Sequence, residues 1–593
     1  MRCIGVALLF ATAAALAEPV PPTGEVFPIE KIRPGLKGKV YTVMQGTEVV
    51  TLDAEIYGVL RDFIGPKIHL IIGKLVDERT KLTGAVHGMS GSPLYIEGKI
   101  TGALSYRLTQ FEKEGWCGFT PIADMIAADG APPPLRKSVP LASPRRTEPQ
   151  LAPASTRDFT LSGGVPTGFR PLGVPVTFSG VHPRVFEWLS AEFARFNRDG
   201  LLLPTLGGGG QEDKPLAGEL EPGAPVAGVL ACGDLHAAGT GTLTWRKGRK
   251  VLGFGHPFSQ VGSLALPMAR AEIVATISSY MYPHKLSNTR QVVGTITQDR
   301  LTAIAGEIGP LPPMTEMTVR LHSARGERTF RTRLFQHPDM TPAIAASCIG
   351  NAMQNTLEYS REFSMRLSAD IETQGHGKVH IEEFYAGEVR DHAAPMQDFA
   401  AVLAELLDNR FATPQVGRIN VDVRMDEEQR TTDLGDVVTD RDRAKPGDTV
   451  TLRATLKPWR GKARVETLTF TVPEDVRAGE LEILVGNAAA ADALDGRRGF
   501  ERLERAQNLD QLVRLLNLRR PKDALYLRVT RRADGIVLGD QRMTALPPSA
   551  MMLYDSNRTA LEGTRLTTAA VLEKRFPMDA VVRGSQTLKI KIE

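Results

Sequence analysis

The stretch Gly88-Met89-Ser90-Gly91-Ser92-Pro93 contains residue types that suit nucleophilic chemistry. A serine between glycines can occupy a tight turn that exposes its hydroxyl, because glycine adopts backbone conformations that other residues avoid. In such a turn the amides of Gly88 and Ser90 can point at one spot, which is the geometry that holds a developing oxyanion. The stretch therefore predicts an acyl-transfer site. A structural turn in a non-enzymatic protein is the simpler alternative.

A second glycine-flanked side chain lies far along the chain, in Gly253-Phe254-Gly255-His256-Pro257. An imidazole at the end of a strand suits the role of a general base, because it must approach the nucleophile without crowding. The same residues could instead form a tight loop around a capped histidine. His256 is therefore a candidate base whose role depends on Ser90.

Both stretches resemble segments of known serine peptidases. The run from Gly88 to Pro93 resembles the nucleophile segment of trypsin-like serine peptidases, and more closely that of the SpoIVB-type peptidases of bacterial sporulation. The run 118–122, followed by Met125, is similar to the closing strand and helix of that family. The resemblance implies a trypsin-like double β-barrel in which Ser90 is the nucleophile.

The histidine segment extends this resemblance, and the two segments together cover roughly a third of the chain. In the SpoIVB-type peptidases a G-T-L-T strand precedes a G-x-G-H segment that carries the catalytic histidine. This chain has Gly241-Thr242-Leu243-Thr244 followed by Gly253-Phe254-Gly255-His256. The resemblance therefore implies that His256 is the base that serves Ser90.

The order of the two segments departs from the family. In trypsin-like enzymes the histidine precedes the serine, whereas here Ser90 precedes His256, so the two barrel halves would occur in swapped order. Triad geometry is defined in space and survives any chain order. For the acidic member, Asp77 lies near the position where the family has its aspartate, and Asp234 is a competitor from the histidine half. We favour Asp77, although a solvated surface carboxylate is the ordinary interpretation of such a residue.

The chain has 593 residues and a globular composition, with 42% hydrophobic and 24% charged residues. At ~150 residues per domain it should contain about three to five domains. A net charge of +4 is too weak a bias to indicate a nucleic-acid partner or a polybasic membrane surface. Many glycines and prolines, 56 and 40, favour turns and short strands over a helical bundle.

The first 17 residues read as a secretory signal peptide, with a basic start, a short apolar run and an A-x-A site ending at Ala17. We therefore expect an exported protein, periplasmic or extracellular, without a membrane span after signal removal. Three cysteines then remain: Cys117, Cys232 and Cys348. One pair could form, but three widely spaced cysteines are not a disulfide framework.

The rest of the chain divides by composition and periodicity. Alternating residues predict β-strands within 18–131, which the resemblance implies form the Ser-containing β-barrel half, and a Pro/Arg-rich linker follows over 132–158. The resemblance implies that 159–336 forms a His-containing β-barrel half, and the residues predict one amphipathic helix there, from Pro183 to Phe196. Two further parts complete the predicted organisation: an α+β segment over 337–430 and an immunoglobulin-like β-sandwich over 440–593, interrupted by a helix over 500–518.

Other candidate sites carry weaker signals. His87 is so near Ser90 that its side chain should point away along the strand. His376 and His380 need not share a face on an extended segment, so we expect no metal. Gly207 to Gly210 lacks a following Gly-Lys-Ser/Thr and should be a loop rather than a phosphate cradle. No organic cofactor is implied.

The residues and the resemblance together predict an exported serine endopeptidase of the SpoIVB type. The resemblance implies a protein or peptide of the cell envelope as its substrate and leaves self-cleavage open as an additional reaction. The alternative is a catalytically inactive envelope scaffold that keeps the fold as a binding surface. A cysteine-dependent enzyme is a third hypothesis, for which the three cysteines lack convincing partners. The distance between Ser90 and His256 in the folded protein should distinguish these hypotheses better than any other single observation.

Overall fold

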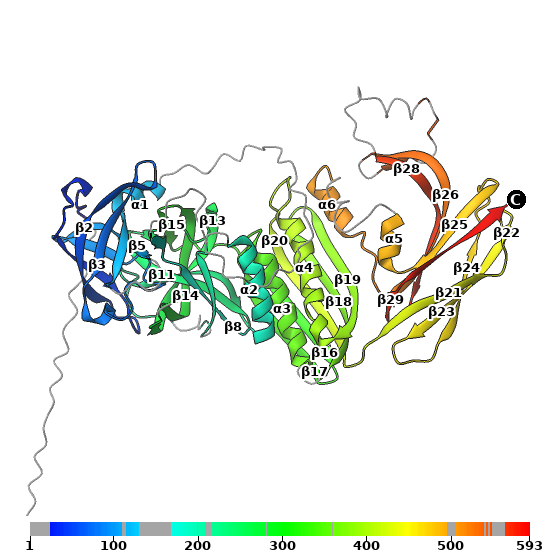
Figure 1. The fold of residues 1–593 in the computed structure, drawn as a ribbon, viewed down its shortest axis with the longest axis horizontal. Helices are drawn as coiled ribbons and strands as arrows, with labels where there is room; N and C mark the ends of the chain where they lie inside the picture. Colours follow the sequence, from blue (N-terminus) through cyan, green and yellow to red (C-terminus); the bar gives the residue numbers. More distant parts are fainter. Residues whose placement is uncertain are drawn as a thin grey trace, which may run out of the picture. The chain divides into compact units, whose positions relative to one another are not determined.

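A computed structural model describes residues 24–108, 114–129, 168–197, 200–207, 210, 215–279, 282–357, 360–494, 506–538, 541–543, 546–547, 549 and 564–593. The predicted signal peptide and the predicted linker over 132–158 lie outside these residues. The chain is mainly β and forms two compact units (Figure 1). The first unit comprises residues up to Gly180 and Ser190–Pro313, and the second comprises Val181–Leu189 and Met314–Glu593.

The first sheet of the first unit closes into a six-stranded barrel. Its strands pair in the order β4-β1-β2-β3-β6-β5, and β5 pairs with β4 to complete the ring. Leu52, Ala54 and Ile56 alternate inward along β2, as its period of two predicts, and pack with Phe119 inside the barrel. The elements of this part are η1 (Ile29–Lys31), β1 (Lys37–Thr42), β2 (Val50–Gly65), β3 (Ile68–Leu75), η2 (Glu78–Thr80), β4 (Pro93–Ile96), β5 (Lys99–Leu108), β6 (Trp116–Pro121), α1 (Ile122–Asp129) and β7 (Phe169–Pro171).

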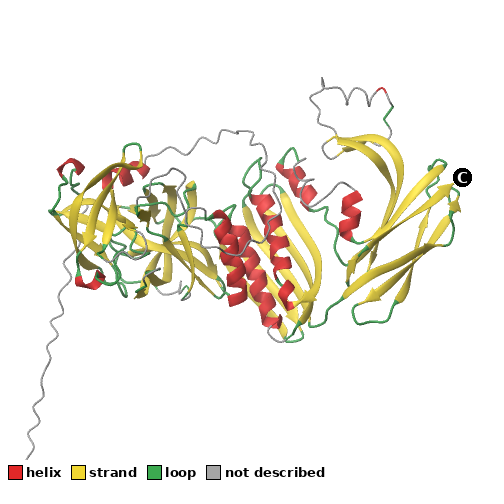
Figure 2. Cartoon of the chain, viewed as in Figure 1, coloured by secondary structure: helices red, strands yellow, loops and turns green. Residues whose placement is uncertain are grey.

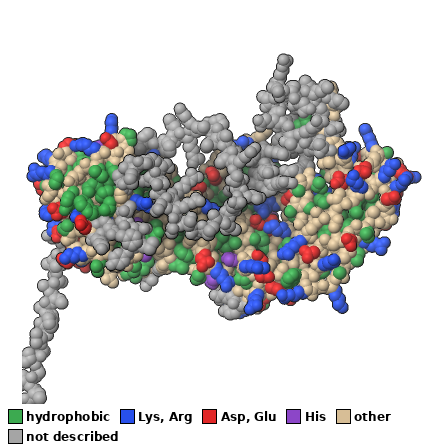
Figure 3. Space-filling view, viewed as in Figure 1, with side chains coloured by type: hydrophobic (Ala, Val, Ile, Leu, Met, Phe, Trp, Pro, Cys, Tyr) green, Lys and Arg blue, Asp and Glu red, His purple; other side chains and the backbone are tan. Residues whose placement is uncertain are grey.

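The outer face of this barrel is partly apolar. Figure 3 shows hydrophobic side chains at the molecular surface of this unit. Tyr57 and Leu60 are 40% and 39% exposed on β2, and the Tyr57 ring lies 4.7 Å from that of Trp116. Lys74 Nζ lies 4.3 Å from the Trp116 ring centroid, within cation–π range. A half-buried strand is expected to have a polar outer face. At Tyr57 on β2, aromatic packing against Trp116 takes the place of polar side chains.

The second sheet of the first unit also returns on itself. Its strands pair in the order β10-β13-β14-β15-β12-β11, and β11 pairs with β10. Two further strands extend the sheet beyond β11: β8 pairs with β11, and β9 runs parallel to β8. The strands are β8 (Val174–Ser179), β9 (Leu202–Leu206), β10 (Pro225–Gly233), β11 (His236–Lys247), β12 (Lys250–Gly253), β13 (Gly262–Ile277), β14 (His284–Arg300) and β15 (Ala303–Ile308).

The second unit begins with helices packed on a sheet (Figure 2). The sheet order is β19-β18-β20-β16-β17, with β16 and β20 parallel. Helices α2, α3 and α4 meet at Gly350, where an added Cβ would lie 3.2 Å from Val185 and 2.3 Å from Met396. The elements are α2 (Pro183–Phe196), β16 (Thr315–Ser323), β17 (Gly326–Leu334), α3 (Met340–Leu357), β18 (Glu362–Thr373), β19 (Gly377–Glu388), η3 (Val389–Asp391), α4 (Ala393–Leu407) and β20 (Val416–Asp426).

This arrangement refines the predicted boundaries. The helix predicted from Pro183 to Phe196 is confirmed with the same ends. Its first half and the strands over 315–334 belong to the second unit, although the sequence grouped them with the His-containing half. The reason is that α2 buries Val185 against α3, a contact that amphipathic spacing alone does not identify.

The C-terminal part consists of two sheets that share one hydrophobic core, to which Leu452, Phe470, Ile483, Leu527 and Ile590 contribute. Their strand orders are β24-β23-β21-β29 and β22-β30-β25-β26-β27, with β28 paired to β26. The elements are β21 (Thr431–Thr439), β22 (Arg443–Ala444), β23 (Thr449–Pro458), β24 (Arg464–Thr471), β25 (Gly479–Gly486), α5 (Ala488–Leu494), α6 (Leu509–Leu516), β26 (Ala524–Leu538), β27 (Gln541–Met543), β28 (Thr564–Pro577), β29 (Val581–Arg583) and β30 (Ser585–Ile592).

The helix predicted over 500–518 is shorter in the described residues. Helix α6 begins at Leu509, because the side chain of Asn508 accepts a hydrogen bond from the Gln511 amide and caps the helix there. Asn517 is its C-cap residue. The apolar spacing predicted a longer helix, but the cap at Asn508 makes the helix begin at Leu509.

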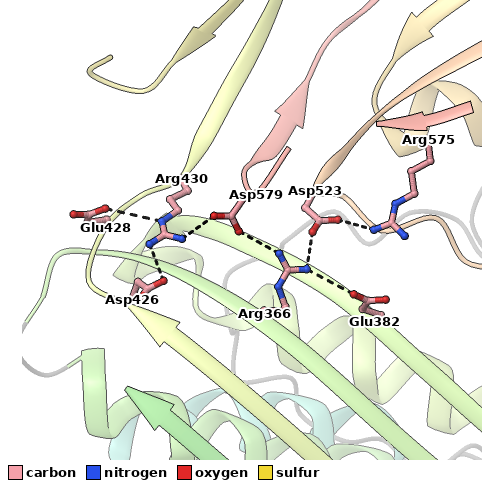
Figure 4. A network of polar contacts seen from close by, with 8 residues as sticks. All are labelled: Arg366, Glu382, Asp426, Glu428, Arg430, Asp523, Arg575 and Asp579. Carbon is pink, nitrogen blue, oxygen red and sulfur yellow. Dashed lines mark hydrogen bonds and ion pairs between the residues drawn. The ribbon is translucent and has the colours of Figure 1, made fainter. Parts of the chain in front are cut away.

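An ionic network ties β18 to the C-terminal sheets within the second unit (Figure 4). Arg366 lies 2.7 Å from Asp523 Oδ2 and 3.2 Å from Asp579 Oδ1. Asp523 is 2% exposed and also contacts Arg575 at 3.3 Å. Arg430 extends the network from Asp579. The buried carboxylate of Asp523 is therefore neutralised mainly by Arg366.

We expect Arg366→Ala to lower the free energy of unfolding of the second unit by about 2–3 kcal/mol, because it leaves a buried carboxylate with one weaker partner. Urea unfolding measures the change. Arg430→Ala is the matched control, since both carboxylates that it contacts most closely are more than half exposed; it should change the stability by less than about 1 kcal/mol. Equal effects of the two substitutions would contradict this account.

Candidate active site

The Ser90 turn precedes β4 and depends on two glycines. Gly88 and Gly91 have φ values of +91° and +95°, in the region that L side chains rarely adopt. The Ser92 amide donates to the Met89 carbonyl at 2.9 Å, and the Gly91 amide donates to Leu104 on β5 at 2.7 Å. The turn is therefore held both by its own backbone and by the hairpin that follows it.

Strand β11 packs directly against this turn. The Thr242 amide donates to the Ser90 carbonyl at 2.7 Å, and Thr244 Oγ1 donates to the Gly91 carbonyl at 2.7 Å. A Cβ added at Gly91 would lie 2.0 Å from Thr242 O and 2.5 Å from the Phe254 nitrogen. The serine segment thus contacts β11, which precedes His256 in the chain, and Phe254, which lies two residues before His256.

His256 follows β12 in a tight loop. Gly255 has φ +69°, and its Cα packs so closely on β5 that an added Cβ would lie 2.9 Å from Ser105 Cβ. Thr120 Oγ1 donates to the Gly255 carbonyl at 2.6 Å. The histidine loop is therefore bound to β5 and β6 of the first barrel, the same hairpin region that holds Gly91.

The His256 ring has a defined tautomer. Its Nδ1 lies 2.7 Å from the Pro257 carbonyl oxygen. A carbonyl oxygen only accepts, so Nδ1 carries the hydrogen and Nε2 keeps its lone pair. Burial lowers the pKa of His256 to about 4, so the ring is neutral at pH 7. A neutral imidazole with a free Nε2 lone pair is the form that a general base requires.

Asp299 on β14 anchors the chain after His256. Its carboxylate accepts hydrogen bonds from the Phe258 and Ser259 amides, both at 2.7 Å, and from Ser259 Oγ at 3.0 Å. Burial raises the pKa of Asp299, while these bonds oppose the shift. Asp299 therefore orders the backbone that follows the base without contacting the imidazole.

The two candidate reactive atoms are enclosed. Ser90 and His256 are each 0% exposed, and neither Ser90 Oγ nor His256 Nε2 has a hydrogen-bond partner among the residues that the structure describes. The two residues are therefore not hydrogen-bonded to each other. The expectation that the glycines expose the Ser90 hydroxyl is wrong in this conformation, because β11, Phe254 and β5 pack against the turn that the glycines allow.

The predicted oxyanion donors remain available. Within the described part of the chain, the backbone amides of Gly88 and Ser90 make no hydrogen bond, whereas the neighbouring amides of Met89 and Gly91 do. Buried amides are normally paired, so two unused donors on either side of Met89 are unusual. The two amides that the predicted oxyanion hole requires are therefore not occupied by other hydrogen bonds.

Asp77 is oriented toward another residue. Its Oδ1 accepts from the Arg79 amide at 2.9 Å and from Arg79 Nε at 2.8 Å, while Oδ2 accepts from Arg79 Nη2 at 2.9 Å. These hydrogen bonds from Arg79 lower the pKa of Asp77. His256 Nδ1 faces Pro257 instead. Asp77 thus caps the η2 turn, and the structure pairs no carboxylate with His256 among the described residues.

The competing candidates occupy other settings. Asp234 lies at the tight turn between β10 and β11, where its carbonyl packs on Gly180. His87 Nδ1 accepts from the Gly173 amide at 2.7 Å, and burial lowers its pKa to about 3. His376 and His380 each bond to an aspartate, Asp510 and Asp370. Cys117, Cys232 and Cys348 are buried on β6, β10 and α3.

A polar network beneath the turn was not predicted. Lys285 on β14 is 1% exposed, and its Nζ lies 2.8 Å from Thr42 Oγ1. Thr42 Oγ1 lies 2.9 Å from Ser92 Oγ, which lies 2.6 Å from the Met89 carbonyl. Burial lowers the pKa of Lys285 to about 7. Alternation along β14 puts Lys285, Ser287 and Thr289 on one buried face, but the sequence alone does not show which face is inside.

Comparison with family models, curated proteins and solved structures returns no match for this chain. The function is therefore argued from the sequence motifs and from the geometry of this site.

Proposed function

We propose that this chain is an exported serine endopeptidase related to the SpoIVB-type peptidases, with two trypsin-like barrel halves in swapped order. The observation that carries the proposal is the packing of the Ser90 turn and the His256 loop on the same strands of one unit. Ser90 Oγ and His256 Nε2 are left without partners there, and two amides are unused. Unsatisfied buried polar atoms are costly, so their concentration at one place favours a functional role.

In the proposed reaction His256 Nε2 takes the proton of Ser90, and Ser90 Oγ attacks a peptide carbonyl. The amides of Gly88 and Ser90 stabilise the oxyanion, and His256 returns the proton to the leaving amine. Water then hydrolyses the acyl-enzyme, again with His256 as base. Substrate reaches Ser90 only after packed neighbours move, so this conformation is a closed form and opening precedes catalysis.

A serine-reactive fluorophosphonate probe tests the proposal, applied to the mature protein in buffer and in urea below the unfolding transition. We expect labelling of the wild type that Ser90→Ala and His256→Ala abolish. Ser364→Ala is the matched control, because Ser364 Oγ is also buried without a partner but lies on β18 of the second unit. Labelling that persists in Ser90→Ala, or is absent from the wild type under every condition, would reject the peptidase.

A catalytically inactive scaffold is the second candidate, favoured by the complete burial of Ser90 and His256. An evolved binding protein has no need of an accessible nucleophile, and the barrel would then serve as a surface for a partner in the cell envelope. The same labelling series separates the two functions, because a scaffold gives no Ser90-dependent label even when urea opens the site.

Ser90→Ala should leave the first unit at least as stable as the wild type, and more stable by about 1 kcal/mol, because it removes a buried hydroxyl that has no partner. The thermal unfolding midpoint measures this change. A clear decrease in the midpoint would mean that Ser90 Oγ makes a stabilising bond, and would argue against a hydroxyl kept for chemistry.

A further inference from the structure

Lys285 stands out among the buried charged groups that the proposed reaction does not use. It is 1% exposed, and its Nζ bonds to a neutral hydroxyl, that of Thr42. Its shifted pKa has burial as its cause, without a contribution from any carboxylate. No carboxylate in the described part of the chain pairs with Lys285. A buried lysine without such a partner destabilises the fold, so its presence beside the Ser90 turn calls for a role.

The hydrogen-bond directions in the network follow from donor counts. Ser92 Oγ has one hydrogen, and the Met89 carbonyl 2.6 Å away can only accept. Ser92 therefore donates to Met89 and accepts from Thr42, whose hydroxyl in turn accepts from Lys285 Nζ. The result is a directed chain from the ammonium group through two hydroxyls to the Met89 carbonyl oxygen.

The Met89 carbonyl belongs to the peptide unit whose N–H is that of Ser90. A trans peptide is planar, so its N–H points away from its C=O, and holding one end orients the other. The second predicted oxyanion amide, that of Gly88, belongs to the peptide unit that begins with the His87 carbonyl. That carbonyl accepts a hydrogen bond from the Lys285 backbone amide at 3.0 Å.

The side chain of Lys285 also supports the turn sterically. A Cβ added at Gly88 would lie 3.2 Å from Lys285 Cβ and 3.5 Å from Lys285 Cδ. The aliphatic stem thus lies against the Gly88 backbone, while the ammonium group reaches past it to Thr42. Lys285 thus contacts the His87–Gly88 peptide unit directly and reaches the Met89–Ser90 peptide unit through Thr42 and Ser92.

We propose that Lys285 is the positioning residue of the oxyanion hole: it orients the His87–Gly88 and Met89–Ser90 peptide units so that both amides face the reacting carbonyl. The proposal rests on the proposed serine chemistry for its functional meaning. The directed chain also polarises the Met89–Ser90 peptide, because hydrogen bonds in series strengthen one another. Lys285 touches neither Ser90 Oγ nor substrate, so it acts through the two peptides.

The test uses a feature of the sequence: among 17 methionines, only Met89 is followed by serine. Protein labelled with carbonyl-¹³C methionine and ¹⁵N serine therefore gives one carbonyl–amide correlation peak, that of the Met89–Ser90 peptide, whether or not the protein is active. The variants are Lys285→Met, which keeps the stem, and Thr42→Val, which breaks the chain. Thr244→Val is the matched control, because Thr244 donates to Gly91, outside the two peptides.

We expect Lys285→Met and Thr42→Val to move the Met89 carbonyl resonance upfield, because they weaken the hydrogen bond that Ser92 Oγ donates to this carbonyl, and Thr244→Val to leave it near the wild-type position. Removing an oxyanion donor costs about 10²–10³ in rate, so misorienting the amides should slow fluorophosphonate labelling by about 10–100-fold. The unfolding midpoint of Lys285→Met should not fall, because the substitution removes a buried charge.

An unchanged Met89 resonance in Lys285→Met, or a moved resonance with an unchanged labelling rate, would overturn the role of Lys285 while leaving the peptidase proposal intact. Absence of Ser90-dependent labelling in the wild type would instead reject the peptidase. In that case the resonance still decides whether Lys285 holds the Met89–Ser90 peptide, so the two failures are distinguishable.

Discussion

Gly91→Ala should lower the free energy of unfolding of the first unit by about 4 kcal/mol or more, enough to unfold a large fraction of a marginally stable protein. Two costs combine. The φ of +95° is unfavourable for alanine by about 1–2 kcal/mol. The new methyl group would lie 2.0 Å from Thr242 O and 2.5 Å from the Phe254 nitrogen, and neither backbone atom can rotate away.

Gly98→Ala separates these two costs. Gly98 lies in the hairpin between β4 and β5 with φ +74°, and an added Cβ there meets no atom within 4 Å. Its substitution should cost about 1–2 kcal/mol from the backbone alone. Urea unfolding of both variants measures the difference. Equal losses of stability would show that the Ser90 turn does not pack against β11 and Phe254, and would remove the basis for placing Ser90 near His256.

The first unit should lose about 6 kcal/mol of stability between pH 7 and pH 5. Burial lowers the pKa values of His256 and His236 to about 4 and that of His87 to about 3, while an unfolded chain has about 6.5. The unfolded state therefore binds more protons below pH 6.5. Each histidine then costs about 2 kcal/mol at pH 5, and the loss continues as the pH falls through the folded values.

Unfolding free energies measured from pH 7.5 to pH 4.5 test this prediction. His256→Gln should remove about 2 kcal/mol of the pH dependence, since it removes one of the three groups. His337→Gln is the matched control, because burial also lowers the pKa of His337 to about 4 but His337 lies in the second unit, so the pH dependence of the first unit should not change. A first unit that is equally stable at pH 5 and pH 7 would mean that these imidazoles become charged without unfolding.

Acid sensitivity bears on the proposed reaction. The same burial that keeps His256 neutral at pH 7 preserves its lone pair for proton abstraction, so the base is in its working form wherever the unit is stable. Lys285 should also make the stability of the first unit increase with pH, over a higher pH range than the histidines. Its folded pKa of about 7 lies below that of an unfolded lysine, so stability should continue to rise between pH 7 and about 10. The first unit should therefore be most stable at neutral to alkaline pH, where His256 is also neutral and can accept a proton.

Local features of the sequence predicted the two candidate segments, since the requirement for glycine is local. A φ near +90° at Gly88 and Gly91 disfavours other residues through the backbone itself, whatever surrounds the turn. The period of two along β2 and the amphipathic spacing of Pro183–Phe196 are local for the same reason, and the structure agrees with both. The mainly β character follows from these patterns.

Only the tertiary structure determined which atoms are enclosed and which groups meet. The glycines predicted an exposed Ser90 hydroxyl, but Ser90 is buried, and β11 and Phe254, which pack against its turn, lie more than a hundred residues away in the chain. The position of Asp77 in the sequence suggested the acidic member of the triad. In the structure both of its carboxylate oxygens accept hydrogen bonds from the guanidinium of Arg79. Lys285 and Asp299 could not be assigned from sequence, because alternation identifies a face of β14 without identifying what that face meets. Backbone conformation is decided within a few residues, whereas burial and pairing are decided by segments that only folding brings together.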